Sequence, residues 1–137
     1  MHMTFNQRQG AVPVTVLSIH GDLDGSTYRD AIAGAQSLYD KGTRNLLLDL
    51  GDVPFMSSAG VVALASIAAL MRGDAQPDPE SGWNALHALE QDINTGVQQH
   101  LKLLNPQPNV DKVLDTVGLK SFLEIHTDLN SAVASFA

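Results

Sequence analysis

A short, almost wholly apolar run near the middle of the chain constrains the fold most strongly. Residues 45–50 read NLLLDL, with four leucines in six positions. A strand with one face in water alternates polar and apolar side chains, whereas such a run is expected of a central strand covered on both faces. A parallel sheet between helices meets that requirement, so the sequence predicts an α/β fold.

The segments around this run alternate between strand and helix patterns. Residues 12–19 are rich in β-branched side chains and stop at Gly21, which predicts a strand. After Ser26 and Thr27, apolar residues recur at three- and four-residue spacing until Gly42, which predicts an amphipathic helix. Similar patterns predict further elements: a first strand near residues 3–7, a helix at 59–71 that begins at two serines, strands at 101–104 and 122–125, and helices at 110–117 and 128–135.

Together these elements predict one α/β domain over residues 1–137. The alternation of strands and helices favours a mixed, mostly parallel central sheet of roughly four to five strands with about four helices.

The composition argues against several classes of function. The net charge is -7 and only eight Lys and Arg are present, whereas nucleic-acid binding draws most of its affinity from clustered basic side chains. The chain has no cysteine, and therefore neither disulfides nor thiolate metal sites. No stretch approaches the roughly 20 apolar residues of a membrane-spanning helix. We expect a cytoplasmic protein with no nucleic-acid or membrane partner.

The sequence gives little support for catalysis or for a metal site. The histidines lie in different predicted elements, without a His-x-x-x-His pair. Residues 58–60 are similar to the end of the nucleophile elbow Gly-x-Ser-x-Gly of α/β-hydrolases. Met56 stands in place of the first glycine, however, and no His-Gly-Gly-Gly motif is present. We expect no enzyme activity, no metal and no cofactor.

Three segments in a fixed order resemble the STAS domains, whose founding members are sulfate-transporter tails and anti-sigma factor antagonists. The first is GDLD at residues 21–24, followed by Thr27. The second is LLDL at residues 47–50, followed by VPFMSSAG at residues 53–60. The third is an Asn-Pro pair at residue 105, followed by a predicted helix that ends in VGL. The resemblance runs over about residues 14–136 and implies the STAS fold.

The resemblance also implies a phosphorylation site. In antagonists of this family the loop before the helix commonly reads Asp-Ser-Ser-Gly or Asp-Ser-Thr-Gly, and the serine after the aspartate accepts the phosphate. That position is Ser58 here, with Ser57 as the second choice. Ser57 replaces the family's aspartate and Ala59 its next hydroxyl residue. The implied partners are an anti-sigma factor with serine-kinase activity, which the unphosphorylated protein would bind, and a serine phosphatase.

The physical chemistry of a helix start is compatible with such a switch. The unpaired N–H groups and partial positive charge of a helix N-terminus tolerate a phosphate, so modification need not unfold the domain. The same phosphate adds about -1.5 to -2 charges where a partner must pack, so binding would be lost. We expect the partner to contact six residues: Asp22, Asp24, Ser57, Ala59, Gly60 and Val61.

Each of these residues also has a purely structural interpretation. Asp22 or Asp24 could satisfy turn amides, while Ser26 or Thr27 caps the following helix. The small side chains of residues 59–71 could let that helix pack closely on the sheet.

Two further expectations concern the whole chain. Residues 73–98 lengthen a connection that is usually much shorter in the family, so we expect an insert there. The alternative function is a STAS scaffold, or an accessory module of a transport system, in which the two serines only cap a helix. Either function is compatible with a monomer or a weak dimer.

Overall fold

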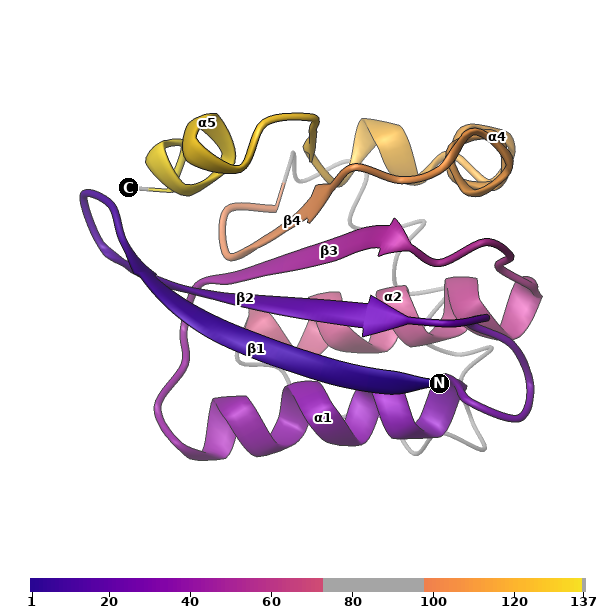
Figure 1. Ribbon diagram of the computed structural model, residues 1–137, viewed down its shortest axis with the longest axis horizontal. Coiled ribbons are helices and arrows are strands. Elements are labelled where there is room, and N and C mark those ends of the chain that lie inside the picture. Colours follow the sequence, from indigo (N-terminus) through magenta and orange to yellow (C-terminus); the bar gives the residue numbers. More distant parts are fainter. Residues whose placement is uncertain (73–97, 137) are drawn as a thin grey trace.

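The computed structural model describes residues 1–72 and 98–136, which form one sheet with helices packed against it (Figure 1). The predicted insert falls almost wholly on residues 73–97, outside the described ranges. The described elements in chain order are β1 (His2–Gln9), β2 (Pro13–His20), α1 (Tyr28–Asp40), β3 (Leu46–Asp52), α2 (Ser58–Met71), β4 (Leu101–Leu104), α4 (Pro108–Thr116), the 3₁₀ helix η3 (Leu119–Ser121), β5 (Ile125–His126) and α5 (Leu129–Ala134).

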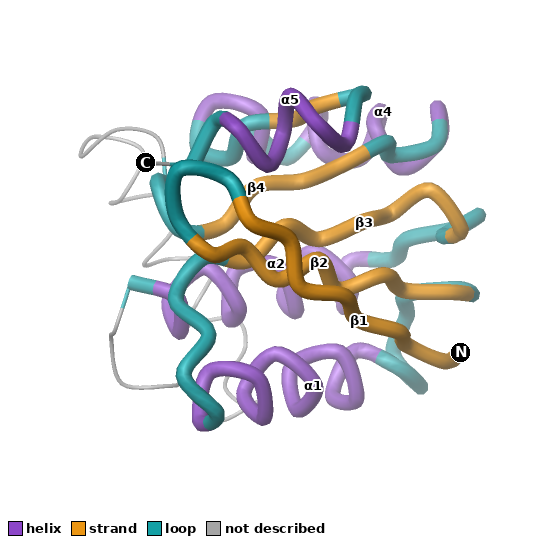
Figure 2. The backbone as a smooth tube through the Cα atoms, turned by 60° about the vertical axis from the view of Figure 1, so that its left-hand side comes forward, coloured by secondary structure: helices purple, strands orange, loops and turns teal. Residues whose placement is uncertain are grey.

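The sheet has five strands in the order β1-β2-β3-β4-β5. β1 pairs antiparallel with β2, and the other neighbouring pairs are parallel. Figure 2 shows β1 to β4 in this order across the sheet. The predicted mixed, mostly parallel sheet is therefore confirmed, and the candidate first strand near residues 3–7 is the eight-residue strand β1.

The central leucine run is buried on both faces of the sheet, as predicted. Leu46, Leu48 and Leu50 join the larger core cluster, to which α1, α2 and α4 contribute. Leu47 points to the other face and joins a smaller cluster with side chains of α5 such as Val133. The alternation of strand side chains thus divides one apolar run between two cores.

The predicted strand at residues 122–125 is wrong in most of its length. The backbone turns at Gly118, whose φ is +82°, and continues as η3, because Phe122 N and Leu123 N both donate to Leu119 O. Both side chains are buried in the larger core, which a strand pairing there would not allow, since successive strand residues face opposite sides. Strand pairing begins only at Ile125.

Helix α2 matches the predicted helix and is buried around almost its whole circumference, from Gly60 to Met71. None of the helices described in residues 1–72 and 98–136 is long and apolar enough to cross a membrane.

Candidate functional site

The loops after β2 and β3 meet at one edge of the sheet because the two strands are parallel. Leu23 of the first loop bridges to Met56 of the second, and Leu23 N donates to Phe55 O at 3.0 Å. Ser57 N in turn donates to Leu23 O at 3.0 Å. These backbone bonds fix the two motif-bearing loops side by side, at the right of Figure 1.

The two adjacent serines have different roles at the start of α2. Ser57 is the N-cap residue, and its hydroxyl accepts a hydrogen bond from Ala59 N at 3.2 Å. Ser58 is the first residue of the helix, and its side chain is exposed. The Ser57 hydroxyl is thus engaged in the cap, whereas the Ser58 hydroxyl makes no hydrogen bond within residues 1–72 and 98–136.

The two aspartates of the first loop also differ. The Asp24 carboxylate accepts hydrogen bonds from Ser26 Oγ at 2.7 Å and Ser26 N at 2.9 Å. These bonds lower the pKa of Asp24 below its usual value. Asp24 therefore holds the turn, in agreement with the structural interpretation, whereas the Asp22 side chain is exposed.

Thr27 occupies the N-cap position of α1, but its side chain makes no cap hydrogen bond. Its hydroxyl instead donates to Asp22 O at 2.8 Å and accepts from Asp24 N at 3.0 Å. The prediction that Ser26 or Thr27 caps the helix is therefore confirmed for the position of Thr27, but its side chain does not make the cap bond. The hydroxyl of Thr27 closes the preceding turn, because the turn places the Asp22 and Asp24 backbone within its reach.

The three residues after Ser58 lie progressively deeper. Ala59 is half-buried, whereas Gly60 and Val61 are buried. A Cβ on Gly60 would lie 2.7 Å from Leu23 O, so glycine is what allows α2 to approach the first loop. Gly60 and Val61, two of the six residues expected to contact a partner, are therefore buried in this structure.

Phe55 is a surface residue that the sequence reasoning did not single out. Its side chain is 49% exposed, beside the exposed Pro54 and between the buried residues Val53 and Met56. Its backbone is held by the bond from Leu23 N, and the Pro54 carbonyl accepts a hydrogen bond from Asn109 Nδ2. The signal available in the sequence was a phenylalanine directly after a proline, in the short connection two residues before Ser57.

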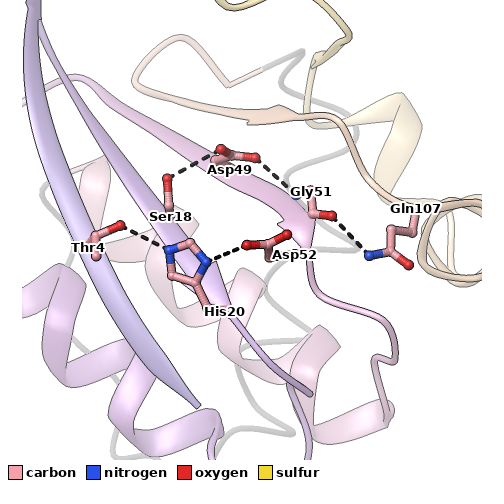
Figure 3. Close-up of polar contacts among 7 residues, drawn as sticks. All are labelled: Thr4, Ser18, His20, Asp49, Gly51, Asp52 and Gln107. Carbon is pink, nitrogen blue, oxygen red and sulfur yellow. Dashed lines mark hydrogen bonds and ion pairs between the residues drawn. The ribbon is translucent and has the colours of Figure 1, made fainter.

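A polar network supports the end of β3 (Figure 3). The loop of residues 53–57, called the Ser58 loop below, begins there and leads to Ser58. His20 Nδ1 lies 2.6 Å from Asp52 Oδ2, and its Nε2 lies 3.0 Å from Thr4 Oγ1. This chain of contacts joins the ends of β1, β2 and β3.

A second part of the network continues toward α4. Asp49 accepts a hydrogen bond from Gly51 N at 2.9 Å, and Gln107 Nε2 donates to Gly51 O at 2.9 Å. Together the two parts of the network fix the position from which the Ser58 loop departs. Among residues 1–72 and 98–136, no three His, Asp or Glu side chains gather closely enough to hold a metal ion.

Comparison with known protein families identifies the family of this chain. The family model of the STAS domain matches residues 3–74, more than half of the chain. The chain therefore belongs to the STAS domain family.

Solved structures with this fold include an anti-sigma factor antagonist from Mycobacterium paratuberculosis, with a TM-score of 0.66 and 16% sequence identity, covering 98% of this chain and 93% of that one. Another is the Bacillus cell fate determinant SpoIIAA in its phosphorylated form, with a TM-score of 0.52 and 18% identity, covering 95% and 96%. A search of the curated proteins gave no significant match.

Proposed function

We propose that this protein is an anti-sigma factor antagonist, a cytoplasmic binding switch that captures an anti-sigma factor with serine-kinase activity and so regulates transcription. The observation that carries the proposal is the exposed hydroxyl of Ser58 at the first position of α2, next to a cap that Ser57 already supplies. Two proteins of the same fold, an anti-sigma factor antagonist and phosphorylated SpoIIAA, support it.

The unphosphorylated surface offers a partner both apolar and polar contacts. Phe55 presents a half-exposed ring on a backbone that hydrogen bonds hold in place. A rigid aromatic side chain loses little conformational entropy on binding, which is why aromatic residues are frequent interface hot spots. On the same two loops and the start of α2, Asp22 and Ser58 are exposed, and Ser57 and Ala59 are half-buried.

Phosphorylation of Ser58 would prevent this contact without unfolding the domain. The first turn of α2 directs backbone N–H groups and a partial positive charge toward the site, which favours an attached phosphate. A partner that covers Phe55 would have to bury the same phosphate, and burying an unpaired charge is costly. In this proposal the kinase is the anti-sigma factor itself, a serine phosphatase restores binding, and this chain catalyses neither step.

The direct test is incubation of the protein with ATP and a candidate anti-sigma kinase from the same genome, followed by phosphopeptide mass spectrometry. We expect phosphate on Ser58 in the wild type and in the Ser57→Ala variant, and none in Ser58→Ala. Binding measured by calorimetry should weaken by at least about 100-fold after phosphorylation, as expected when a charge is buried without a partner. Phosphate on Ser57 would overturn the assignment of the acceptor.

A second function is favoured by one feature, the serine at position 57 where the family's antagonists commonly have aspartate. In that case the chain would be a scaffold, or an accessory module of a transport system, that binds its partner without modification. Tight binding with no phosphate on either serine would support this alternative. A Phe55→Ala variant would weaken binding in both cases, so it tests the surface and not the switch.

A further inference from the structure

A cavity of about 420 Å³ lies at the end of the sheet opposite Ser58, between the β1–β2 hairpin and the connection from α1 to β3. In Figure 1 this connection is on the left and the start of α2 is on the right. Thr15, which lines the cavity, and His20, next to the Ser58 loop, are separated on β2 by roughly 16 Å of strand. The cavity volume falls within the range of roughly 300–1,000 Å³ that is typical of small-molecule sites.

One wall of the cavity is apolar. Phe5 lines it and is 56% exposed, although it sits on the side of β1 that faces α1. Leu38, near the end of α1, contributes further apolar surface. An exposed aromatic ring over a hollow offers a flat contact to a ring of similar size.

The cavity lining also carries two cationic side chains. Lys41 and Arg44 line the cavity, and none of the described residues that line it is acidic. This contrasts with a chain that has 15 Asp and Glu against eight Lys and Arg. Lys41 has no ion-pair partner among residues 1–72 and 98–136, so its charge is available to a ligand.

Arg44 is held in place by its own contacts. Its Nη1 donates to Tyr39 O and to Thr43 O, both at 2.9 Å, and its guanidinium lies 3.9 Å from the centre of the Tyr39 ring. Both carbonyls lie at or just beyond the C-terminus of α1, so the Arg44 charge offsets the partial negative charge of that helix end. Nε and Nη2 of Arg44 make no hydrogen bond within the described residues, so they can donate to a ligand.

Two threonine hydroxyl groups also lie at the cavity lining. Thr15 is buried, and its Oγ1 lies 3.2 Å from Oγ1 of Thr43, at the cavity lining. From the apolar wall, the two cations and the absence of lining carboxylates, we infer that this cavity binds a small organic anion with an aromatic ring, the ring on Phe5 and the anionic group on Lys41 and Arg44. The inference does not depend on the function proposed for the Ser58 surface.

The test is a titration of the isotope-labelled full chain with three probes, followed by amide chemical shifts. Phenyl phosphate carries both features of the ligand, inorganic phosphate only the charge and benzyl alcohol only the ring. We expect saturable shifts at Thr15, Thr43 and Arg44 with phenyl phosphate, and affinities at least about tenfold weaker for the other two probes. Equal affinity for all three, or no saturable shift with phenyl phosphate up to about 10 mM, would overturn the inference.

Variants separate the proposed contacts from general charge effects. The Lys41 side chain makes no hydrogen bond or ion pair within the described residues, so its replacement should not disturb the fold. Lys41→Gln should weaken phenyl phosphate binding at least about fivefold, as should Phe5→Ala. Arg44→Gln should weaken it further, provided that its amide spectrum shows an intact fold. Lys112→Gln on the exposed side of α4 makes the same charge change elsewhere and should leave the affinity unchanged. Unchanged affinity in Lys41→Gln, or an equal loss in Lys112→Gln, would contradict the assignment.

Discussion

Ser57 Oγ accepts a hydrogen bond from Ala59 N at 3.2 Å, so the residue before the proposed phosphorylation site caps the helix. The loss of a serine cap typically costs about 1 kcal/mol. We expect Ser57→Ala to lower the free energy of unfolding by about that amount, and Ser57→Asp to preserve it because aspartate is an equally good cap. Urea unfolding measures both.

The matched control is the neighbouring serine. Ser58→Ala removes an exposed hydroxyl, so its effect on stability should stay within about 0.5 kcal/mol. A larger loss in Ser58→Ala than in Ser57→Ala would mean that the roles of the two serines are reversed.

Gly60 is expected to tolerate no side chain. A Cβ there would lie 2.5 Å from Met56 Cγ and 2.7 Å from Leu23 O, and the second of these atoms belongs to the backbone. Gly60→Ala should lower the free energy of unfolding by about 1–3 kcal/mol, although alanine is the better helix former. Gly25→Ala is the control, since a Cβ at Gly25 meets nothing within 4 Å. Equal stability of the two variants in urea would refute the close approach of α2 to the first loop.

The contact between His20 and Asp52 should contribute little to global stability but more to local order. Asp52 is 70% exposed at its side chain, and exposed pairs contribute at most about 1 kcal/mol. We expect Asp52→Asn to cost less than that in urea unfolding while amide exchange becomes faster in the Ser58 loop. Asp115→Asn, on the exposed end of α4, should change neither quantity. Unchanged exchange at residues 53–57 in Asp52→Asn would show that the contact does not support the loop.

Asp24 should make stability depend on pH in the acid range. Its hydrogen bonds with Ser26 lower its pKa in the folded state below the ordinary value of 3.8. The unfolded chain therefore takes up the proton at a higher pH, so the contribution is complete above pH 3.8 and is lost as pH falls through the folded pKa.

In Asp24→Asn, the decrease in unfolding free energy below pH 3.8 should be smaller than in the wild type. It should not vanish, because the Ser131 backbone N–H lowers the pKa of Asp128 in the same direction. Urea titrations at a series of acid pH values measure the slope, and identical slopes would contradict the role given to Asp24.

The alternation of strands and helices, the buried leucine run and the position of the two serines at a helix start were all predictable from the sequence. Each depends on local pattern: side-chain period, turn residues and cap chemistry act over a few neighbouring positions. The prediction of a strand at residues 122–125 was wrong because it, too, depended on local pattern alone. Apolar residues in sequence do not show whether a 3₁₀ turn will bury Phe122 and Leu123 on one side.

The sequence by itself determined the fold class, the family and the motif that contains Ser58. Only the tertiary structure decided which residues of that motif reach the surface. Gly60 and Val61 are buried because α2 packs against the first loop, whereas Phe55 is exposed because the loop backbone is fixed by bonds from Leu23 and Asn109. The cavity between Phe5 and Arg44 likewise exists only because the sheet brings β1 beside the end of α1. Burial and cavities depend on contacts between distant segments, and local sequence patterns do not encode those contacts residue by residue.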